Sequence, residues 1–213
     1  MPTTIDIETE LSAVNSILGS IGQSPVTTLG VTSDGTVTYA NPEIAFIYNF
    51  LKECNREVQN EGWHFNTEHH IKSDAYRDTI SKHITIPTNV LRMDIHEEYL
   101  DRYKDVVRRN GRLYDKVNHT DEFTEDVYMD FVWLLEFTDI PSVFQRYIIA
   151  KASTRAATQL VSNPQLVALL QQQEAQTRAS CMEYECNQGD HNFMGFPHET
   201  TYRTYKPYTV LQR

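Results

Sequence analysis

The chain has 213 residues, a length typical of one domain or two small ones. Hydrophobic residues make up 40% of it and charged residues 23%, which argues against a disordered chain, a collagen and a coiled-coil rod. With 29 acidic and 19 basic residues the net charge is -10, which argues against a protein that wraps nucleic acid, because affinity for phosphate comes from clustered Lys and Arg.

The N-terminus and the cysteines predict a protein that is made in the cytoplasm and has no contact with a membrane. Residues 1–10 contain neither a basic residue nor the apolar core of a signal peptide. The longest strongly apolar run, about residues 131–135, is far shorter than the ~20 residues that span a bilayer. Three cysteines cannot pair evenly and are typical of free thiols in a reducing compartment: Cys54, Cys181, Cys186.

Two helices are predicted near the N-terminus. The first has apolar residues at steps of three and four, with Thr9 as its cap and Gly22 at its end. Residues 24–39 are rich in Thr, Ser and Gly and predict a loop with a short strand over residues 36–39. The second helix begins at Asn41-Pro42-Glu43, ends before Gly62 and carries a wide apolar stripe: Ile44, Phe46, Ile47, Phe50, Leu51, Cys54, Val58.

The middle of the chain changes to the alternating pattern of strands. A first strand is predicted around Trp63, Phe65 and Thr67, and a last one over residues 127–137. Between them, Asn110-Gly111 predicts a tight hairpin turn, since both residues accept the positive φ that such a turn requires. Further apolar residues lie at Ile80, Ile84, Ile86, Val90, Leu91 and Ile95. The turn spacing predicts an antiparallel sheet of four to six strands.

Helical periodicity returns after Pro141. One helix follows directly, and Asn163-Pro164 begins a last long helix that runs to about Glu185, with an apolar face of Leu166, Leu169 and Leu170. The rest of the chain has no period but is rich in aromatic residues, which favours contact with a partner over free solvation. The predicted partner-binding residues of this tail are Phe193, Phe196, Tyr202, Tyr205 and Tyr208.

These elements predict an α+β fold with a discontinuous helical bundle. The bundle combines residues 1–62 with residues 138–187, an antiparallel β lobe is inserted over residues 63–137, and residues 188–213 form an extended C-terminal tail.

The histidines and cysteines predict no metal site and no cofactor. Cys181 and Cys186 are five positions apart on a helix, and His191 and His198 have six residues between them, spacings that fit a structural zinc site poorly. His69 and His70 belong to one predicted strand, whose alternation would turn them to opposite faces, so they would not serve one site.

Catalytic residues are not predicted either. The chain has no Gly-x-Ser-x-Gly motif and no glycine-rich phosphate loop. Paired acids leave one alternative open, a glycan or cell-wall hydrolase that uses two carboxylates. The pairs are Glu97-Glu98, Asp121-Glu122 and Glu125-Asp126.

Basic residues are densest around the predicted hairpin, between Arg102 and Lys116. Arg108, Arg109 and Arg112 could form a charged contact loop for an acidic partner or for a phosphate backbone. The same charges could also keep an exposed hairpin soluble, and interleaved aspartates favour that interpretation.

Four stretches, in this order along the chain, resemble one known family. They are Glu10-Leu11-Ser12-Ala13-Val14-Asn15; Asn55-Arg56-Glu57-Val58-Gln59 with Gly62-Trp63-His64-Phe65-Asn66; Asp139-Ile140-Pro141 with Phe144; and Cys181-Met182-Glu183-Tyr184-Glu185. The set resembles tail tubular protein A of short-tailed bacteriophages (podoviruses), and the resemblance covers about residues 10–30, 43–70 and 138–187.

The resemblance implies a structural protein of the virion tail without enzymatic activity. Its members form a homo-oligomeric ring of twelve copies that joins the portal protein to tail tubular protein B, the nozzle, near the attachment of the tail fibres. Such a ring continues the channel for DNA ejection, and the genome passes through it without sequence-specific binding.

Overall fold

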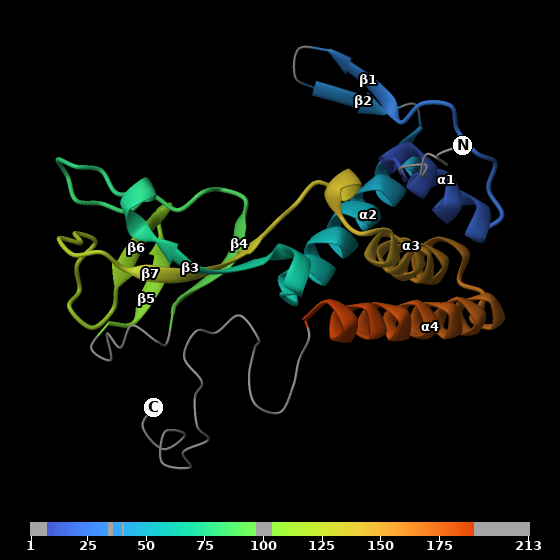
Figure 1. Cartoon of the computed structure of the whole chain (residues 1–213). Helices are drawn as coiled ribbons and strands as arrows, with labels where there is room; N and C mark the ends of the chain where they lie inside the picture. The colour runs from blue at the N-terminus through green and yellow to red at the C-terminus, as the bar shows by residue number, and fades with distance from the viewer. Residues whose placement is uncertain (1–7, 34–35, 40, 97–103, 190–213) are drawn as a thin grey trace, which may run out of the picture.

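The computed structural model describes residues 8–33, 36–39, 41–96 and 104–189. Helices from both ends of the chain lie together on one side of the molecule, and the strands of the middle segment lie on the other (Figure 1). Each group of elements has its own apolar core. The α+β class and the discontinuous bundle are therefore confirmed, while the predicted tail lies outside the described residues from 190 onward.

The helical body contains α1 (Glu10–Ser20), α2 (Pro42–Asn60), α3 (Ser142–Ala156) and α4 (Pro164–Gly189). The predicted start of α1 is confirmed, because the Thr9 hydroxyl accepts a hydrogen bond from the backbone N–H of Ser12 at 3.2 Å. Asn41 caps α2 in the same way, and Gly22 and Gly62 follow the two helices with φ of 78° and 79°.

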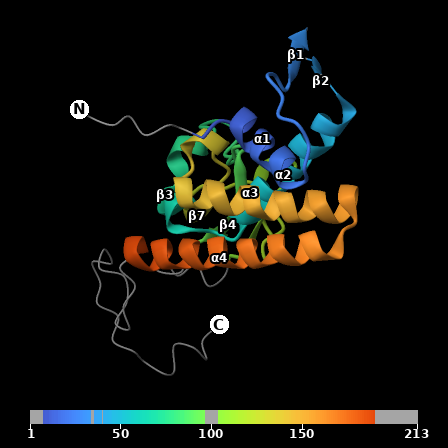
Figure 2. The same cartoon turned by 90° about the vertical axis from the view of Figure 1, so that its right-hand side faces the viewer.

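The core of this body lies between α1, α2 and α3. Its fully buried members include Ile17, Ile47, Leu51, Phe144 and Ile148, and burial of each such side chain contributes about 2 kcal/mol. The fourth helix runs beside α3 on the outside of the bundle (Figures 1 and 2).

Two helical faces differ from the prediction. Phe46 is 56% exposed although Phe50 is buried, because Phe46 lies about 100° around α2 from Ile47, beyond the edge of the buried stripe. On α4, Leu170 and Cys181 are buried but Leu169 is 66% exposed, since the helix contacts the body along one narrow face.

A small hairpin projects from the helical body (Figure 1). Its strands are β1 (Gly30–Ser33) and β2 (Thr36–Tyr39), which pair antiparallel with Ser33 opposite Thr36. The sequence predicted only the second strand, because β1 carries the Gly, Ser and Thr pattern of a loop.

In the part of the β lobe that the structure describes, five strands form two sheets rather than one sheet of four to six strands. Strands β3 (Thr67–Lys72) and β4 (Val90–Ile95) flank the central β7 (Tyr128–Trp133), all antiparallel. The second sheet is the hairpin of β5 (Val106–Arg109) and β6 (Arg112–Asp115). Its turn is confirmed, with φ of 52° at Asn110 and 74° at Gly111.

The ends of the β lobe depart from the alternating pattern. Residues 64–66 form a 3₁₀ turn instead of a strand, and β7 stops at Trp133. Trp63 and Phe137, which the predicted boundaries assign to the β lobe, are buried in the helical core. Ile84 and Ile86 are buried in the β lobe outside its strands, whereas Ile80 is 90% exposed. The division of the chain at residues 62 and 138 remains a prediction.

Two buried amides join the lobes. The Asn66 side chain donates to the carbonyls of Gln59 on α2 and Trp133 on β7, at 2.8 and 2.9 Å, and accepts from the backbone N–H of Trp63 at 2.9 Å. The Gln59 side chain donates to the Leu135 carbonyl at 3.0 Å and accepts from its N–H at 2.8 Å. The side-chain oxygen and nitrogen of both amides thus have hydrogen-bond partners, and both nitrogens donate across the junction.

The Asn66→Ala variant should lower the free energy of unfolding by about 3 kcal/mol, because it leaves the Trp63 N–H and the Trp133 carbonyl without this partner in a buried site. Asn55→Ala is the matched control, since it removes one bond to Gln59 while the bonds of Gln59 to Leu135 remain, and it should cost about 1 kcal/mol. Urea unfolding measures both values, and equal losses would contradict a special role for Asn66.

Candidate functional site

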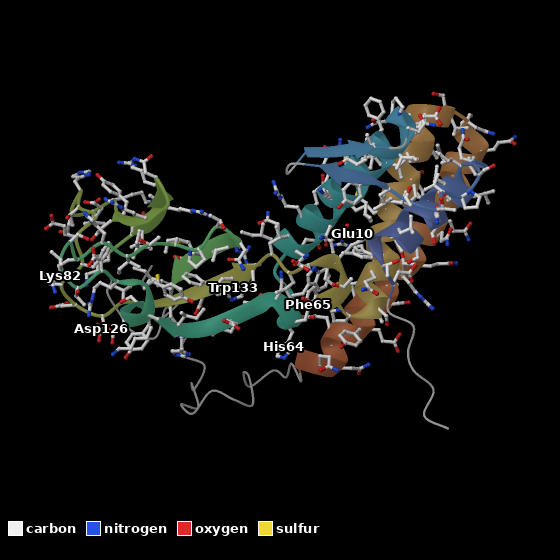
Figure 3. All side chains as sticks on the ribbon, turned by 90° about the horizontal axis from the view of Figure 1, so that it is seen from above. Glu10, His64, Phe65, Lys82, Asp126 and Trp133 are labelled. Carbon is white, nitrogen blue, oxygen red and sulfur yellow. The ribbon has the colours of Figure 1, made fainter. Side chains whose placement is uncertain are left out.

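Aromatic and polar contacts are concentrated where the two lobes meet. The Phe144 ring of α3 packs against Trp63 at 4.8 Å, Phe65 at 4.7 Å and Tyr184 at 5.9 Å between ring centroids. Figure 3 shows Phe65, His64 and Trp133 at the passage from the helices to the strands. Aromatic pairs at these separations contribute about 1 kcal/mol each beyond burial, so the cluster fixes the start of the β lobe against α3 and α4.

Polar contacts tie α4 to the same junction. The Glu185 carboxylate accepts a hydrogen bond from the backbone N–H of His64 at 2.8 Å. Arg178 forms a two-pronged contact with Glu61 at 2.9 and 3.1 Å and donates to the Tyr147 hydroxyl at 2.7 Å. Hydrogen bonding to Glu61 raises the pKa of Arg178. The long helix is therefore attached to both α2 and α3.

Ion pairs between α2 and α3 form a charged seam along the bundle. The Arg155 guanidinium contacts both Glu57 oxygens at 2.9 Å and Glu53 at 3.2 Å, and Lys151 lies 3.1 Å from Glu57. Burial opposes the charge of Glu57, but these two cations outweigh it and lower its pKa. An open groove of about 250 Å³ lies beside the seam, lined by Lys151, Thr154, Arg155, Thr158, Gln159 and Glu174.

The predicted contact loop lies on β5 and β6, where its three arginines are exposed. Arg108 donates to the Val90 carbonyl at 3.2 Å, and the Arg109 guanidinium lies 4.0 Å from the centre of the Tyr114 ring. Arg112 lies 3.6 Å from the Asp121 carboxylate. Each arginine has a contact within the lobe, so its role toward a partner remains a prediction.

Three of the paired carboxylates that the structure describes lie beside basic residues. Asp121 lies beside His83 and Arg112, Glu125 lies 3.6 Å from Lys104, and Glu97-Glu98 are outside the described residues. The Lys72 ammonium lowers the pKa of Asp126 to about 2. A glycosidase needs the opposite, one carboxyl group whose pKa is raised so that it can donate a proton.

Cys181 and Cys186 differ in burial, and two of the histidines considered with them lie outside the described part of the chain. Cys181 is buried and lies 3.5 Å from the Val143 carbonyl, Cys186 is exposed, and burial raises the pKa of the Cys181 thiol to about 12. His191 and His198 are among the residues that the structure does not describe.

The expected alternation of His69 and His70 is wrong. The register of β3 against β7 shifts between Glu68 and Ile71, and His70 has φ of 61°. This bulge brings both rings beside His96, with centroid distances of 6.2 Å from His69 and 3.6 Å from His70. A bulge depends on pairing with β7, so no residue pattern within β3 announces it.

The chain thus consists of two separately cored lobes held together by a buried junction. In a comparison with protein families, residues 11–191 match the model of the tail tubular protein family, and the chain belongs to that family. It is a structural protein of the phage virion tail. No curated protein matches the chain.

Three of the four stretches that resemble the family meet at the junction. Gln59, Trp63 and Asn66 come from the second stretch, Phe144 from the third, and Glu185 from the fourth. Sequence reasoning did not single out these residues as a site, because buried amides and aromatics carry no signal of their own outside the resemblance. None of the described helices is long and apolar enough to span a membrane.

The stability that Asp126 contributes should depend on pH. Lys72 lies 2.8 Å from one Asp126 oxygen and Arg77 lies 2.8 Å from the other, with Asp74 sharing both cations. Because the folded-state pKa is lowered to about 2, the contribution is present above the unfolded pKa of about 3.9 and is lost as the pH falls to about 2.

Urea unfolding of the wild type and of Asp126→Asn tests this from about pH 5 to about pH 2. The wild type should be the more stable at the upper end, and the difference should vanish at the lower end. Glu125→Gln is the control, since Glu125 is exposed and lies 3.6 Å from Lys104. A difference that stays constant down to the lowest pH would contradict the ion-pair account.

Proposed function

We propose that this chain is the subunit of an adaptor ring that joins the portal to the tail nozzle and continues the channel for DNA ejection. The observation that carries the proposal is membership in the tail tubular protein family over residues 11–191. The resemblance of the sequence to tail tubular protein A supplies the finer role, including the ring of twelve copies, the portal and tail tubular protein B as partners, and tail fibres near the lower junction.

The shape of the subunit supports this role. The helical body and the β lobe lie at opposite ends of the molecule, so one subunit can contact different partners at its two ends (Figure 1). The junction and the contacts of Arg178 and Glu185 hold the two ends in a fixed relation. A fixed spacing between two docking ends suits a protein that links two rings.

The charge of the chain supports a passage for DNA rather than a binding surface. A net charge of -10 per copy, repeated around a ring, gives a predominantly acidic wall that repels the DNA backbone. The proposal is that Arg108, Arg109 and Arg112 face away from the bore. A ring structure with these arginines lining the bore would contradict it.

Mixing the purified full chain with a portal ring tests the adaptor role. The expected product is a complex with twelve copies of the chain per portal, counted by native mass measurement or by electron microscopy. The portal alone and the chain alone are the controls. Failure to bind, together with glycan hydrolysis that a single Asp or Glu substitution abolishes without unfolding, would instead favour the hydrolase.

The aromatic tail is proposed to become buried when the ring assembles. Its five predicted contact residues lie outside the described part of the chain: Phe193, Phe196, Tyr202, Tyr205, Tyr208. Limited proteolysis after Gly189 should be fast for the free chain and at least about tenfold slower in the portal complex, because burial withholds the segment from the protease. Equal rates in the two states would contradict this proposal.

A further inference from the structure

The exposed side of the three-stranded sheet carries a compact group of imidazoles around one carboxylate. Asp130 lies on the central strand β7, and the His96 Nδ1 atom, just after β4, lies 2.8 and 3.0 Å from its two oxygens. The His69 Nδ1 atom, from β3, lies 3.2 Å from Asp130 Oδ2. Residues of β3 and β7 and the residue directly after β4 thus contribute to the group.

The backbone of β3 is shaped to hold this arrangement. The register shift beside His70 and its φ of 61° turn the His70 N–H toward Asp130, to which it donates at 3.2 Å. The His70 ring stacks on His96 with its centroid 3.6 Å away. These contacts orient the Asp130 carboxylate and the His96 ring before any ligand arrives.

We propose that His69, His96 and Asp130 form a binding site for a divalent transition-metal ion such as Zn²⁺. Two imidazole nitrogens and one carboxylate oxygen are ligands that Zn²⁺ accepts, and the three ligand atoms lie within 4.8 Å of one another. A tetrahedral ion needs ligands about 3.4 Å apart, and His69 Nδ1 lies 3.2 Å from Asp130 Oδ2. Water takes the fourth position.

Charge and access both favour a cation at this position. Asp94 of β4 lies directly opposite Asp130 in the register, so two carboxylates face each other on one side of the sheet, which is unfavourable without a positive charge. Side-chain exposures of 56% for His69 and 27% for Asp130 leave a path from solvent.

The consequence of occupancy is a cross-link of β3, β4 and β7. The ion would take the place of the direct contacts between the two Nδ1 atoms and Asp130, and the bonds to it would link β3, β7 and the residue directly after β4. The site therefore acts on the stability of the β lobe and does not depend on the proposed role in the tail.

Zinc binding to the full chain without an affinity tag tests the site. Isothermal titration with Zn²⁺, with the metal content measured after dialysis, should show about one ion per chain bound at this site. His69→Ala and His96→Ala should each weaken binding at least about tenfold, since even partners outside the ligand shell commonly contribute that much.

Two control variants separate this site from other donors. His83→Ala removes a histidine that lies 3.3 Å from one carboxylate, Asp121, and should leave zinc binding unchanged. Cys186→Ser removes the exposed thiol and should also leave it unchanged.

The proposal fails if the chain binds no Zn²⁺, if His69→Ala binds it as tightly as the wild type, or if Cys186→Ser abolishes binding. Because the His69 side chain is exposed, that variant keeps the test decisive even if His96→Ala does not fold. A zinc-dependent rise in the melting temperature of the wild type, absent in His69→Ala, would give independent support.

Discussion

The buried amides of Gln59 and Asn66 determine how the rest of the molecule is arranged. A junction between a helix and a sheet leaves backbone groups that neither element can satisfy alone, and these two side chains supply the missing partners at Trp63, Trp133 and Leu135. Phe144 and its aromatic neighbours exclude water from the same place, which strengthens each hydrogen bond and makes each broken one costly.

Charged side chains join helices on one side of this junction and strands on the other. In the helical body, Arg155 and Arg178 join neighbouring helices by contacts with Glu57 and Glu61, so the outer helix is held although it buries few apolar side chains. In the β lobe, the ion pairs of Asp126 and the imidazoles around Asp130 fasten the strands of a sheet that has one exposed side. These cations thus lie where elements meet.

Local signals predicted the elements that depend on local chemistry. Asn41-Pro42 began a helix and Asn110-Gly111 formed the tight turn, because capping and positive φ are properties of a few adjacent residues. The strand expected at Trp63 and the alternation expected at His69 failed, since the helical core captures Trp63 and pairing with β7 creates the bulge. The junction and the histidine group unite residues distant in sequence, which periodicity does not relate.

Because the helical bundle is discontinuous in sequence, its parts are synthesised at different times. The ribosome releases α1 and α2 long before α3, whose Phe144 and Ile148 complete their core. Until then the apolar stripe of α2 lacks its cover, whereas the inserted strands already possess all their pairing partners. The nascent chain is consequently most prone to aggregate during the interval between these two events, and closure across so many residues makes the helical half the slow step of maturation.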